Sequence, residues 1–368
     1  MSNPLARIEP VQERLQPPVS WYVDPAIHAL ELQHVFGPGP GYVGHGSMVP
    51  DVGSYHVLDW KGDAWMLVRN ADGVDVLSNV CRHRQAVMLD GRGTTRNIVC
   101  PIHRWSYDLR GDQRAAPHFP ENPCRSLDRR PLRSWNGLLF EGRRDVATEL
   151  AAFSMAEAFD YSDYVYERTV VDDYPINWKT FLEIYLELYH VEPFHSGLKG
   201  YVDCGAFTPS DWEFGETWSN QVMTIKGDMS AASEEYRRYY QVVSELRGRP
   251  PRHASLWFCL YPNVMLEWYP EALAVSFLLP TSPSTTRNVV DFFYPRDVVT
   301  DHPEVVEAHQ AAYNESADED RFIVERIDRG RRALFALGLD DVGPYQEPLE
   351  DGMVHFHRWL RAQLAPHL

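Results

Sequence analysis

The chain twice pairs a cysteine with a histidine across a short spacer, in Cys81-Arg82-His83 and in Cys100-Pro101-Ile102-His103. Two thiolates and two imidazoles can hold tetrahedral zinc, but zinc fingers usually pair cysteine with cysteine and histidine with histidine. Here each loop offers one of each. That order suits a two-iron two-sulfur cluster in which one iron takes both cysteines and the other takes both histidines. We therefore interpret these four residues as ligands of a cluster that passes single electrons.

The second loop continues through Trp105 and Tyr107 to Gly111, and it resembles the second cluster-binding loop of Rieske oxygenases. The resemblance implies that the Tyr107 hydroxyl points toward a cysteine sulfur and that Trp105 packs beside the loop, where both side chains tune the reduction potential. The first loop departs from the family at Gln85, a position that is commonly glycine. We expect this difference to affect only the conformation of the turn that follows His83.

A second candidate metal site lies in residues 177–195, which end with His190 and His195. The stretch resembles the mononuclear iron motif of Rieske non-haem iron oxygenases. Two imidazoles and one carboxylate on one face of a ferrous ion leave the opposite positions open for dioxygen and substrate. The resemblance therefore implies an iron site at which O2 is activated.

The spacing of this stretch predicts its local structure. Glu183, Glu187 and His190 stand at i, i+4 and i+7, and we expect them to share one stripe of a helix. His195 does not belong to that stripe, so both histidines can reach one metal only if the helix is interrupted between them. We expect Pro193 to supply the interruption, because proline lacks a backbone donor and clashes with the preceding turn.

Two further roles follow from the resemblance. Glu187 takes the position of a carboxylate that bridges toward the Rieske histidine of a neighbouring subunit, and glutamate at this position favours monooxygenation. Ile184 replaces the asparagine that many relatives carry near the iron, which makes that side of the pocket drier.

The third iron ligand is expected from an acidic segment far downstream. Residues 318–330 resemble the C-terminal acidic helix of the family, and the spacing to Glu325 selects Asp320 over Asp318 and Glu319. Acidic runs are usually solvated helix faces. Because the three acids point in different directions around a helix, we expect only one of them to face the metal.

Length and composition set the broad class. The 368 residues exceed one ordinary domain and predict two. The net charge of -17 argues against a nucleic-acid partner and against affinity for anionic membranes. The chain has no apolar run of membrane-spanning length, and residues 1–19 are charged and contain proline, so we expect a soluble, cytoplasmic protein. Beyond the two cluster ligands the cysteines show no paired spacing, and we expect no disulfides.

The chain also lacks a fingerprint for NAD or flavin. The glycine-rich run at 37–41 is interrupted by prolines, which cannot donate the amide hydrogens that a phosphate cradle needs. We therefore expect electrons from a separate reductase or ferredoxin. The resemblance implies a Rieske 2Fe-2S cluster, mononuclear Fe(II), O2 as co-substrate, and a homotrimer in which electrons cross between neighbouring subunits.

The fold expected from the resemblance is α+β, in three parts. Residues 1–44 form an N-terminal helical segment that packs on the catalytic domain, and residues 45–145 form a small antiparallel β Rieske domain. Residues 150–368 form a helix-grip, START-like catalytic domain in which a curved antiparallel sheet wraps a long helix. Residue patterns predict these elements: a helix at 22–36, strands at 55–59, 64–69, 74–79, 135–141 and 164–172, a linker at 142–149, a helix at 233–246, strands between 256 and 293, and helices from 303 onward.

The expected function is that of the catalytic alpha subunit of a terminal oxygenase, hydroxylating a small organic substrate. We favour an aromatic or other organic acid. The alternatives are oxidative N-demethylation or hydroxylation of a quaternary ammonium compound and, in a different class, a Rieske electron-transfer protein without oxygenase activity. The candidates for an aromatic pocket or a cation cage are Trp257, Phe258, Tyr261, Trp268 and Tyr269. We expect most of the aromatic residues between 256 and 293 to be ordinary core. The predicted pocket residues are Ile184, Phe258, Tyr261 and Trp268.

Overall fold

The computed structural model describes residues 16–368, which divide into two compact units. The smaller unit comprises Pro40–Ala147 and Tyr164–Tyr166, and the larger unit comprises the described residues up to Gly39, Thr148–Asp163 and Glu167–Leu368. The domain bounds expected from the sequence, 1–44, 45–145 and 150–368, stay a prediction. Residues 1–15 of the first segment lie outside the described residues.

The smaller unit is built from short antiparallel strands. They form a five-stranded sheet in the order β5-β2-β3-β4-β9 and two three-stranded sheets, β1-β11-β10 and β6-β7-β8. The strands are β1 (Tyr42–His45), β2 (Ser54–Val57), β3 (Trp65–Asn70), β4 (Gly73–Ser78), β5 (Arg92–Thr94), β6 (Ile98–Val99), β7 (Ser106–Tyr107), β8 (Gln113–Ala115), β9 (Arg129–Arg130), β10 (Arg133–Trp135) and β11 (Leu138–Phe140). Met66 and Val68 of β3 pack in one core with Cys81 and Cys100, so the two loops are anchored by the interior.

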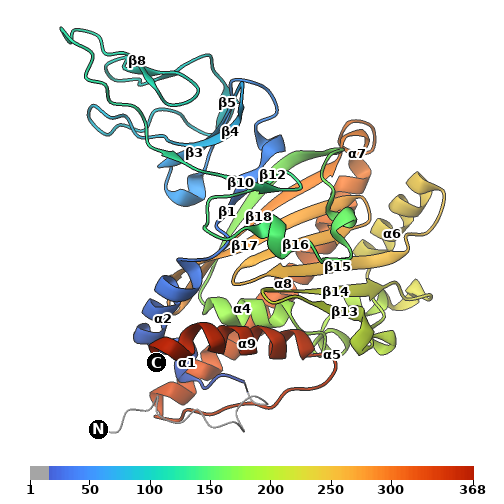
Figure 1. Cartoon of the computed structure of the whole chain (residues 1–368). Helices are drawn as coiled ribbons and strands as arrows, with labels where there is room; N and C mark the ends of the chain where they lie inside the picture. The colour runs from blue at the N-terminus through green and yellow to red at the C-terminus, as the bar shows by residue number, and fades with distance from the viewer. Residues whose placement is uncertain (1–15) are drawn as a thin grey trace. The chain divides into compact units, whose positions relative to one another are not determined.

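The larger unit contains a seven-stranded sheet in the order β12-β18-β17-β16-β15-β14-β13, which Figure 1 shows edge to edge as one twisted layer. Its pairings from β13 to β18 are antiparallel. The strands are β12 (Tyr164–Tyr174), β13 (Trp212–Phe214), β14 (Trp218–Thr224), β15 (His253–Leu260), β16 (Val264–Tyr269), β17 (Ala272–Ser282) and β18 (Thr285–Pro295). The central strands β15, β16 and β17 are buried along most of their length.

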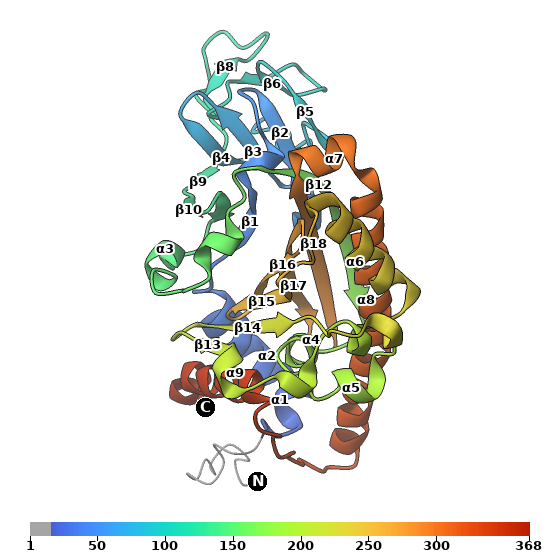
Figure 2. The same ribbon diagram turned by 90° about the vertical axis from the view of Figure 1, so that its right-hand side faces the viewer.

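Helices α6 and α8 lie alongside each other against this sheet, as Figure 2 shows. Ser233 caps α6 by accepting a hydrogen bond from the Tyr236 amide, and Gly248 ends it in the left-handed conformation. The long helix α8 buries Val305, Ala308 and Ala312 in the core. The helices are α1 (Ser20–Val23), α2 (Pro25–Glu31), α3 (Val146–Glu149), α4 (Trp178–Tyr185), α5 (Val191–Phe194), α6 (Glu234–Arg247), α7 (Arg296–Asp301), α8 (Pro303–Ala336) and α9 (Asp351–Leu364).

A buried ion pair fixes the N-terminal helices to α4. Glu31 at the end of α2 accepts hydrogen bonds from the Trp178 indole at 2.9 Å and from the Lys179 ammonium at 2.5 Å. Glu31, Trp178 and Lys179 are fully buried. Such a pair is expensive to break, because removing one partner leaves an uncompensated charge in the interior. The start of α4 is therefore held in place ahead of the histidines that follow it.

Some expected elements differ from the observed ones. The single helix expected at 22–36 is divided, because Asp24 adopts an extended conformation and caps α2 through the Ala26 amide. A π-helical turn at Leu32–Phe36 follows α2. The expected linker at 142–149 contains α3. Within residues 16–368, no helix combines the length and apolar character that crossing a membrane requires.

Candidate metal centres and substrate cavity

The two Cys-His loops share one backbone shape. In each loop the residue four positions after the cysteine, Gln85 or Arg104, has a positive φ of 55° or 61°. Its amide donates to the carbonyl of Cys81 or Cys100 at 3.1 Å. Glycine adopts this conformation without steric cost, which explains why the family commonly has glycine at the first of these turns. The glutamine at 85 leaves the turn intact.

The side chains of these loops are arranged as a cluster site requires. Cys81 and Cys100 are buried, and the Tyr107 hydroxyl lies 3.6 Å from the Cys81 sulfur. The ring of His83 lies 4.7 Å from that of His103, centroid to centroid, and stacks on Trp105 at 4.9 Å. The buried Nδ1 of His83 has no hydrogen-bond partner within the described part of the chain. An unsatisfied imidazole nitrogen beside two buried thiols fits a metal cluster.

The segment before the histidines does not follow the expected helical stripe. Helix α4 ends at Tyr185, so Glu187 and His190 lie beyond it, and the prediction that Glu183 shares a stripe with them is wrong. The Glu187 carboxylate accepts a hydrogen bond from the backbone amide of His190 at 3.0 Å, and this bond replaces a helical one.

The helix resumes as α5, flanked by the two histidines. His190 is its N-cap and His195 is its C-cap. Pro193 lies inside this single turn, where its missing amide is one of the donors that a helix start leaves unpaired anyway. The interruption therefore precedes His190, and Pro193 does not supply it, contrary to the sequence-based expectation.

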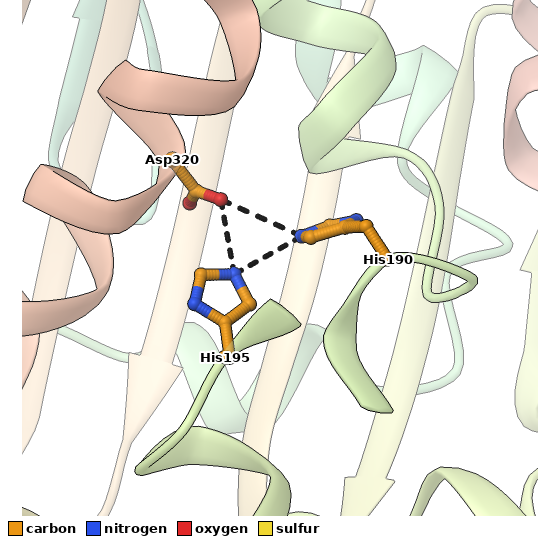
Figure 3. A group of neighbouring side chains, drawn as sticks. All are labelled: His190, His195 and Asp320. Carbon is orange, nitrogen blue, oxygen red and sulfur yellow. Dashed lines mark hydrogen bonds and ion pairs between the residues drawn. The ribbon is translucent and has the colours of Figure 1, made fainter. Parts of the chain in front are cut away.

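His190, His195 and Asp320 converge on one point, as Figure 3 shows. The two Nε2 atoms lie 3.1 Å apart, and Asp320 Oδ1 of α8 lies 3.0 Å from His195 Nε2 and 3.4 Å from His190 Nε2. Of the three acids considered from sequence, Asp320 is the one in this group. Glu319, expected to point elsewhere, reaches the opposite nitrogen of His195 instead.

Carboxylates hold the outer nitrogens of both rings. Glu187 lies 2.5 Å from His190 Nδ1, and Glu319 lies 2.7 Å from His195 Nδ1. Such partners fix the tautomer that leaves Nε2 available and raise the basicity of the ligand. Apart from its place in an acidic run, no feature of the sequence distinguished Glu319.

The electrostatics of the group favour a bound cation. Burial lowers the pKa of His190, but hydrogen bonds to Asp320 and Glu187 outweigh it and raise the pKa to about 10. Burial raises the pKa of Asp320, whereas hydrogen bonds to His190 and His195 lower it below its ordinary value. Three carboxylates around two imidazoles thus carry excess negative charge, and two imidazoles with one carboxylate suit ferrous iron.

A cavity of about 160 Å³ adjoins the triad. It is smaller than the roughly 300–1,000 Å³ of sites for drug-sized molecules, so it suits a small substrate. Its walls come from β12, β15, β16, β17, β18, α4, α6 and α8. Ile184 lines it, as expected, together with Glu187, His190, His195 and Asp320.

The aromatic lining differs from the prediction. Trp257 and Tyr269 line the cavity, whereas three predicted pocket residues lie outside it: Phe258, Tyr261 and Trp268. Neighbouring residues of a strand point to opposite faces, so Phe258 and Trp268 face away when Trp257 and Tyr269 face in. Tyr261 instead contacts His355, Phe356 and Trp359.

Sequence reasoning missed several polar residues of the cavity, among them Glu267 and His309. Both are buried. Glu267 interrupts the otherwise apolar and aromatic strand Val264–Tyr269, and a lone acid in such a strand is a signal that was available. His309 lies within a long charged helix and offered no comparable signal.

Comparison with known proteins identifies the family. The family model for the ring hydroxylating alpha subunit (catalytic domain) matches residues 159–366, and that for the Rieske [2Fe-2S] domain matches residues 40–135. The chain belongs to the Rieske oxygenases. The expected α+β fold class is confirmed, because Rieske oxygenase structures match nearly the whole chain.

Three similar proteins are informative. A putrescine 2-hydroxylase of Ralstonia nicotianae is 49% identical over 98% of this chain and 99% of its own length. A putrescine 2-hydroxylase of Bordetella bronchiseptica is 43% identical over 95% of this chain and 85% of its own. The solved structure of a quaternary ammonium Rieske monooxygenase, described for carnitine oxidation and inter-subunit electron transfer, has a TM-score of 0.73 at 21% identity, covering 96% of each chain.

Family membership decides the class of activity. This Rieske oxygenase uses a 2Fe-2S cluster, a mononuclear iron and O2, and takes electrons from a separate partner. The alternative of a pure electron-transfer protein is thereby set aside. The preference for an aromatic or other organic acid receives no support, since these relatives are named for amines or quaternary ammonium compounds.

Proposed function

We propose that this Rieske oxygenase hydroxylates a small aliphatic diamine of the putrescine type at carbon 2. The observation that carries the proposal is the 49% identity to a putrescine 2-hydroxylase along 98% of this chain and 99% of that relative. The similarity extends along nearly the whole of both chains, so it is not confined to one of the two units.

The charges of the cavity support a cationic substrate. Its lining includes the acids Asp172, Glu187, Glu267 and Asp320. The single arginine in the lining, Arg321, already lies over the Tyr174 ring at 3.9 Å and 3.7 Å from Asp172. An organic acid would need a free cation at the site, whereas an ammonium group is attracted by the surplus of carboxylates.

The metal ligands are part of the same proposal. Cys81, His83, Cys100 and His103 would hold the cluster, with Trp105 and Tyr107 beside it, and His190, His195 and Asp320 would hold the iron. When bound, the iron supplies the open coordination positions at which dioxygen is activated. Glu187 and Glu319 orient the two imidazoles through their Nδ1 atoms.

The remaining residues position the substrate and exclude water. Ile184, Val290 and Phe292 give the cavity apolar walls, which suit the methylene chain of a diamine. A substrate held by its charged ends would present its carbon chain to the triad. We further propose that Glu187 joins the electron path from His103 of a neighbouring subunit in a homotrimer, and that a reductase or ferredoxin reduces the cluster.

The test is a substrate panel with the purified holo-enzyme and a generic reductase. We expect O2 uptake coupled to formation of a putrescine product heavier by one oxygen, and little coupled uptake with benzoate, choline or carnitine. The holo-enzyme should contain about three irons and two acid-labile sulfides per chain. Coupled turnover of choline or carnitine, with putrescine inert, would replace diamine hydroxylation with the quaternary ammonium alternative.

A further inference from the structure

Glu267 is a buried carboxylate in the wall of the cavity. It stands in the middle of β16, is 4% exposed, and has side-chain atoms that line the cavity. The Tyr269 hydroxyl donates to Glu267 Oε2 at 2.7 Å, and the Trp257 indole donates to the Tyr269 hydroxyl at 3.1 Å. This chain of donors holds the carboxylate in one orientation.

Two other buried acids of the larger unit, Glu31 and Glu183, have cationic partners. Glu31 pairs with Lys179, and Glu183 pairs with Arg331 at 2.7 Å and with His357 at 2.9 Å. Across residues 16–368, by contrast, Glu267 makes no ion pair with a basic side chain. A buried carboxylate without a counter-charge is costly, and here it borders a cavity that a ligand can enter.

The titration of Glu267 reflects this environment. Burial raises its pKa to about 7, although hydrogen bonds from Tyr269 and Tyr313 lower it. An ammonium group beside the carboxylate would favour its charged form. The Glu267 carboxyl group would therefore lose its proton more readily when an ammonium group binds beside it.

Aromatic rings surround the same part of the cavity. On the sheet, Trp257 is the cross-strand partner of Glu267 on one side, and the small residue Ala274 is its partner on the other side. Ala274 in turn pairs with Phe292, so an alanine separates the carboxylate from the next ring. Rings of this kind attract an alkylammonium group through their faces.

Helix α8 adds a second polar group to this wall. His309 lines the cavity, is 2% exposed, and packs its ring 5.0 Å from that of Tyr269. Its Nδ1 bonds to the Tyr294 hydroxyl at 2.9 Å, whereas its Nε2 has no partner among the residues that the structure describes. A buried nitrogen without a protein partner in a cavity wall is a position at which a polar group can bind.

We propose that Glu267 is the residue that binds one ammonium group of the substrate, inside a cage that Trp257, Tyr269 and Tyr313 complete. The inference rests on the proposed diamine activity and deepens it by assigning its recognition residue. A primary ammonium suits the site better than a quaternary one, because it has N–H donors for the carboxylate. The carbon chain then runs from Glu267 toward His190, His195 and Asp320.

The test is amine binding to Glu267→Gln, which removes the charge but keeps the shape and an acceptor for Tyr269. Putrescine binding to the anaerobic holo-enzyme is measured by calorimetry, so turnover is not needed. We expect the Kd to rise by at least about 30-fold, as for loss of a buried charge partner. The Kd of butylamine, which has one ammonium group, should rise by a similar factor.

Glu271→Gln is the matched control. Glu271 lies in the same hairpin and pairs with Arg247 outside the cavity, so this variant should bind putrescine within about threefold of wild type. Both variants should keep the Rieske spectrum and the iron content. A Kd within threefold of wild type for Glu267→Gln would overturn the assignment.

The outcomes also separate the assignment from the proposed function. Putrescine that binds through Glu267 without being hydroxylated would contradict the function alone. A wild-type enzyme that binds neither putrescine nor butylamine would overturn the role of Glu267. If Glu267→Gln does not fold, Tyr269→Phe serves instead: loss of one donor should weaken binding about 3- to 10-fold, and unchanged binding would overturn the assignment.

Discussion

Single side chains decide which acid joins the two histidines of the candidate iron site. Asp318, Glu319 and Asp320 are consecutive, but a helix turns each one by about 100° from its neighbour. Asp320 consequently faces the two Nε2 atoms, and Glu319 reaches His195 Nδ1 from the outer side. One helix turn thus supplies both a candidate ligand and the group that orients another ligand.

Asp320→Ala should lose the mononuclear iron and keep the Rieske spectrum, because it removes a candidate ligand of the larger unit and leaves the cluster loops unchanged. Asp318→Ala should keep all iron, since Asp318 is outside the triad. Metal analysis and visible spectroscopy measure both. Loss of iron in Asp318→Ala, with iron retained in Asp320→Ala, would move the ligand to Asp318.

Glu187→Gln should slow oxidation of the reduced cluster by about 10-fold or more while both metal sites stay loaded. The substitution keeps an acceptor beside His190 but removes the charge from the proposed electron path. Stopped-flow absorbance of the Rieske cluster on mixing with O2 and substrate measures it. The control, Glu319→Gln, alters the other histidine and should affect iron affinity more than cluster oxidation.

At the level of elements, the turn after His195 depends on close backbone packing. A Cβ added at Gly200 would lie 2.0 Å from the Ala232 amide nitrogen, whereas one at Gly227 would meet nothing within 4 Å. Gly200→Ala should therefore lower the free energy of unfolding by about 1–3 kcal/mol through overpacking. Gly227→Ala should change it by less than about 1 kcal/mol. Thermal unfolding compares them, and equal melting temperatures would contradict this account.

Helices that begin and end at local capping residues were predictable from the sequence. Ser233 and Gly248 bound α6 within one residue of the expected helix at 233–246, because a cap and a left-handed glycine act locally. The break before His190 was not predictable. It depends on the Glu187 carboxylate, which accepts a hydrogen bond from the His190 amide in place of a helical backbone carbonyl. Helical periodicity does not show that a side chain replaces a backbone acceptor.

The cavity-facing side of the sheet was equally hard to predict. Most residues on both faces of β15 and β16 are apolar or aromatic, since both faces are buried, and Glu267 is an exception. Alternation of polar and apolar residues therefore cannot distinguish Trp257 from Phe258. By contrast, the residues of the two cluster loops could be proposed from the sequence, because metal chemistry restricts residue type and spacing. These residues are Cys81, His83, Cys100, His103, Trp105 and Tyr107.

For the whole molecule, the open question is how electrons reach the iron. In the proposed electron path, the exposed His103 is the exit from the cluster, and the Glu187–His190 contact is the entry to the iron. The proposed homotrimer joins these two points across neighbouring subunits. A head-to-tail ring gives every iron one neighbouring cluster.

Two inactive chains should therefore complement each other when they are co-expressed. His103→Ala lacks a working cluster and Asp320→Ala lacks the iron, so each alone should be inactive. Each head-to-tail ring that contains both chains has one productive pair among three, which predicts about a third of wild-type activity for purified mixed trimers. The unfractionated mixture should show about a quarter, because only about three quarters of randomly assembled trimers contain both chains. Doubly tagged, mixed oligomers are purified and assayed for substrate-dependent O2 uptake. Inactive mixed oligomers, or an active monomer by light scattering, would show that electrons stay within one chain.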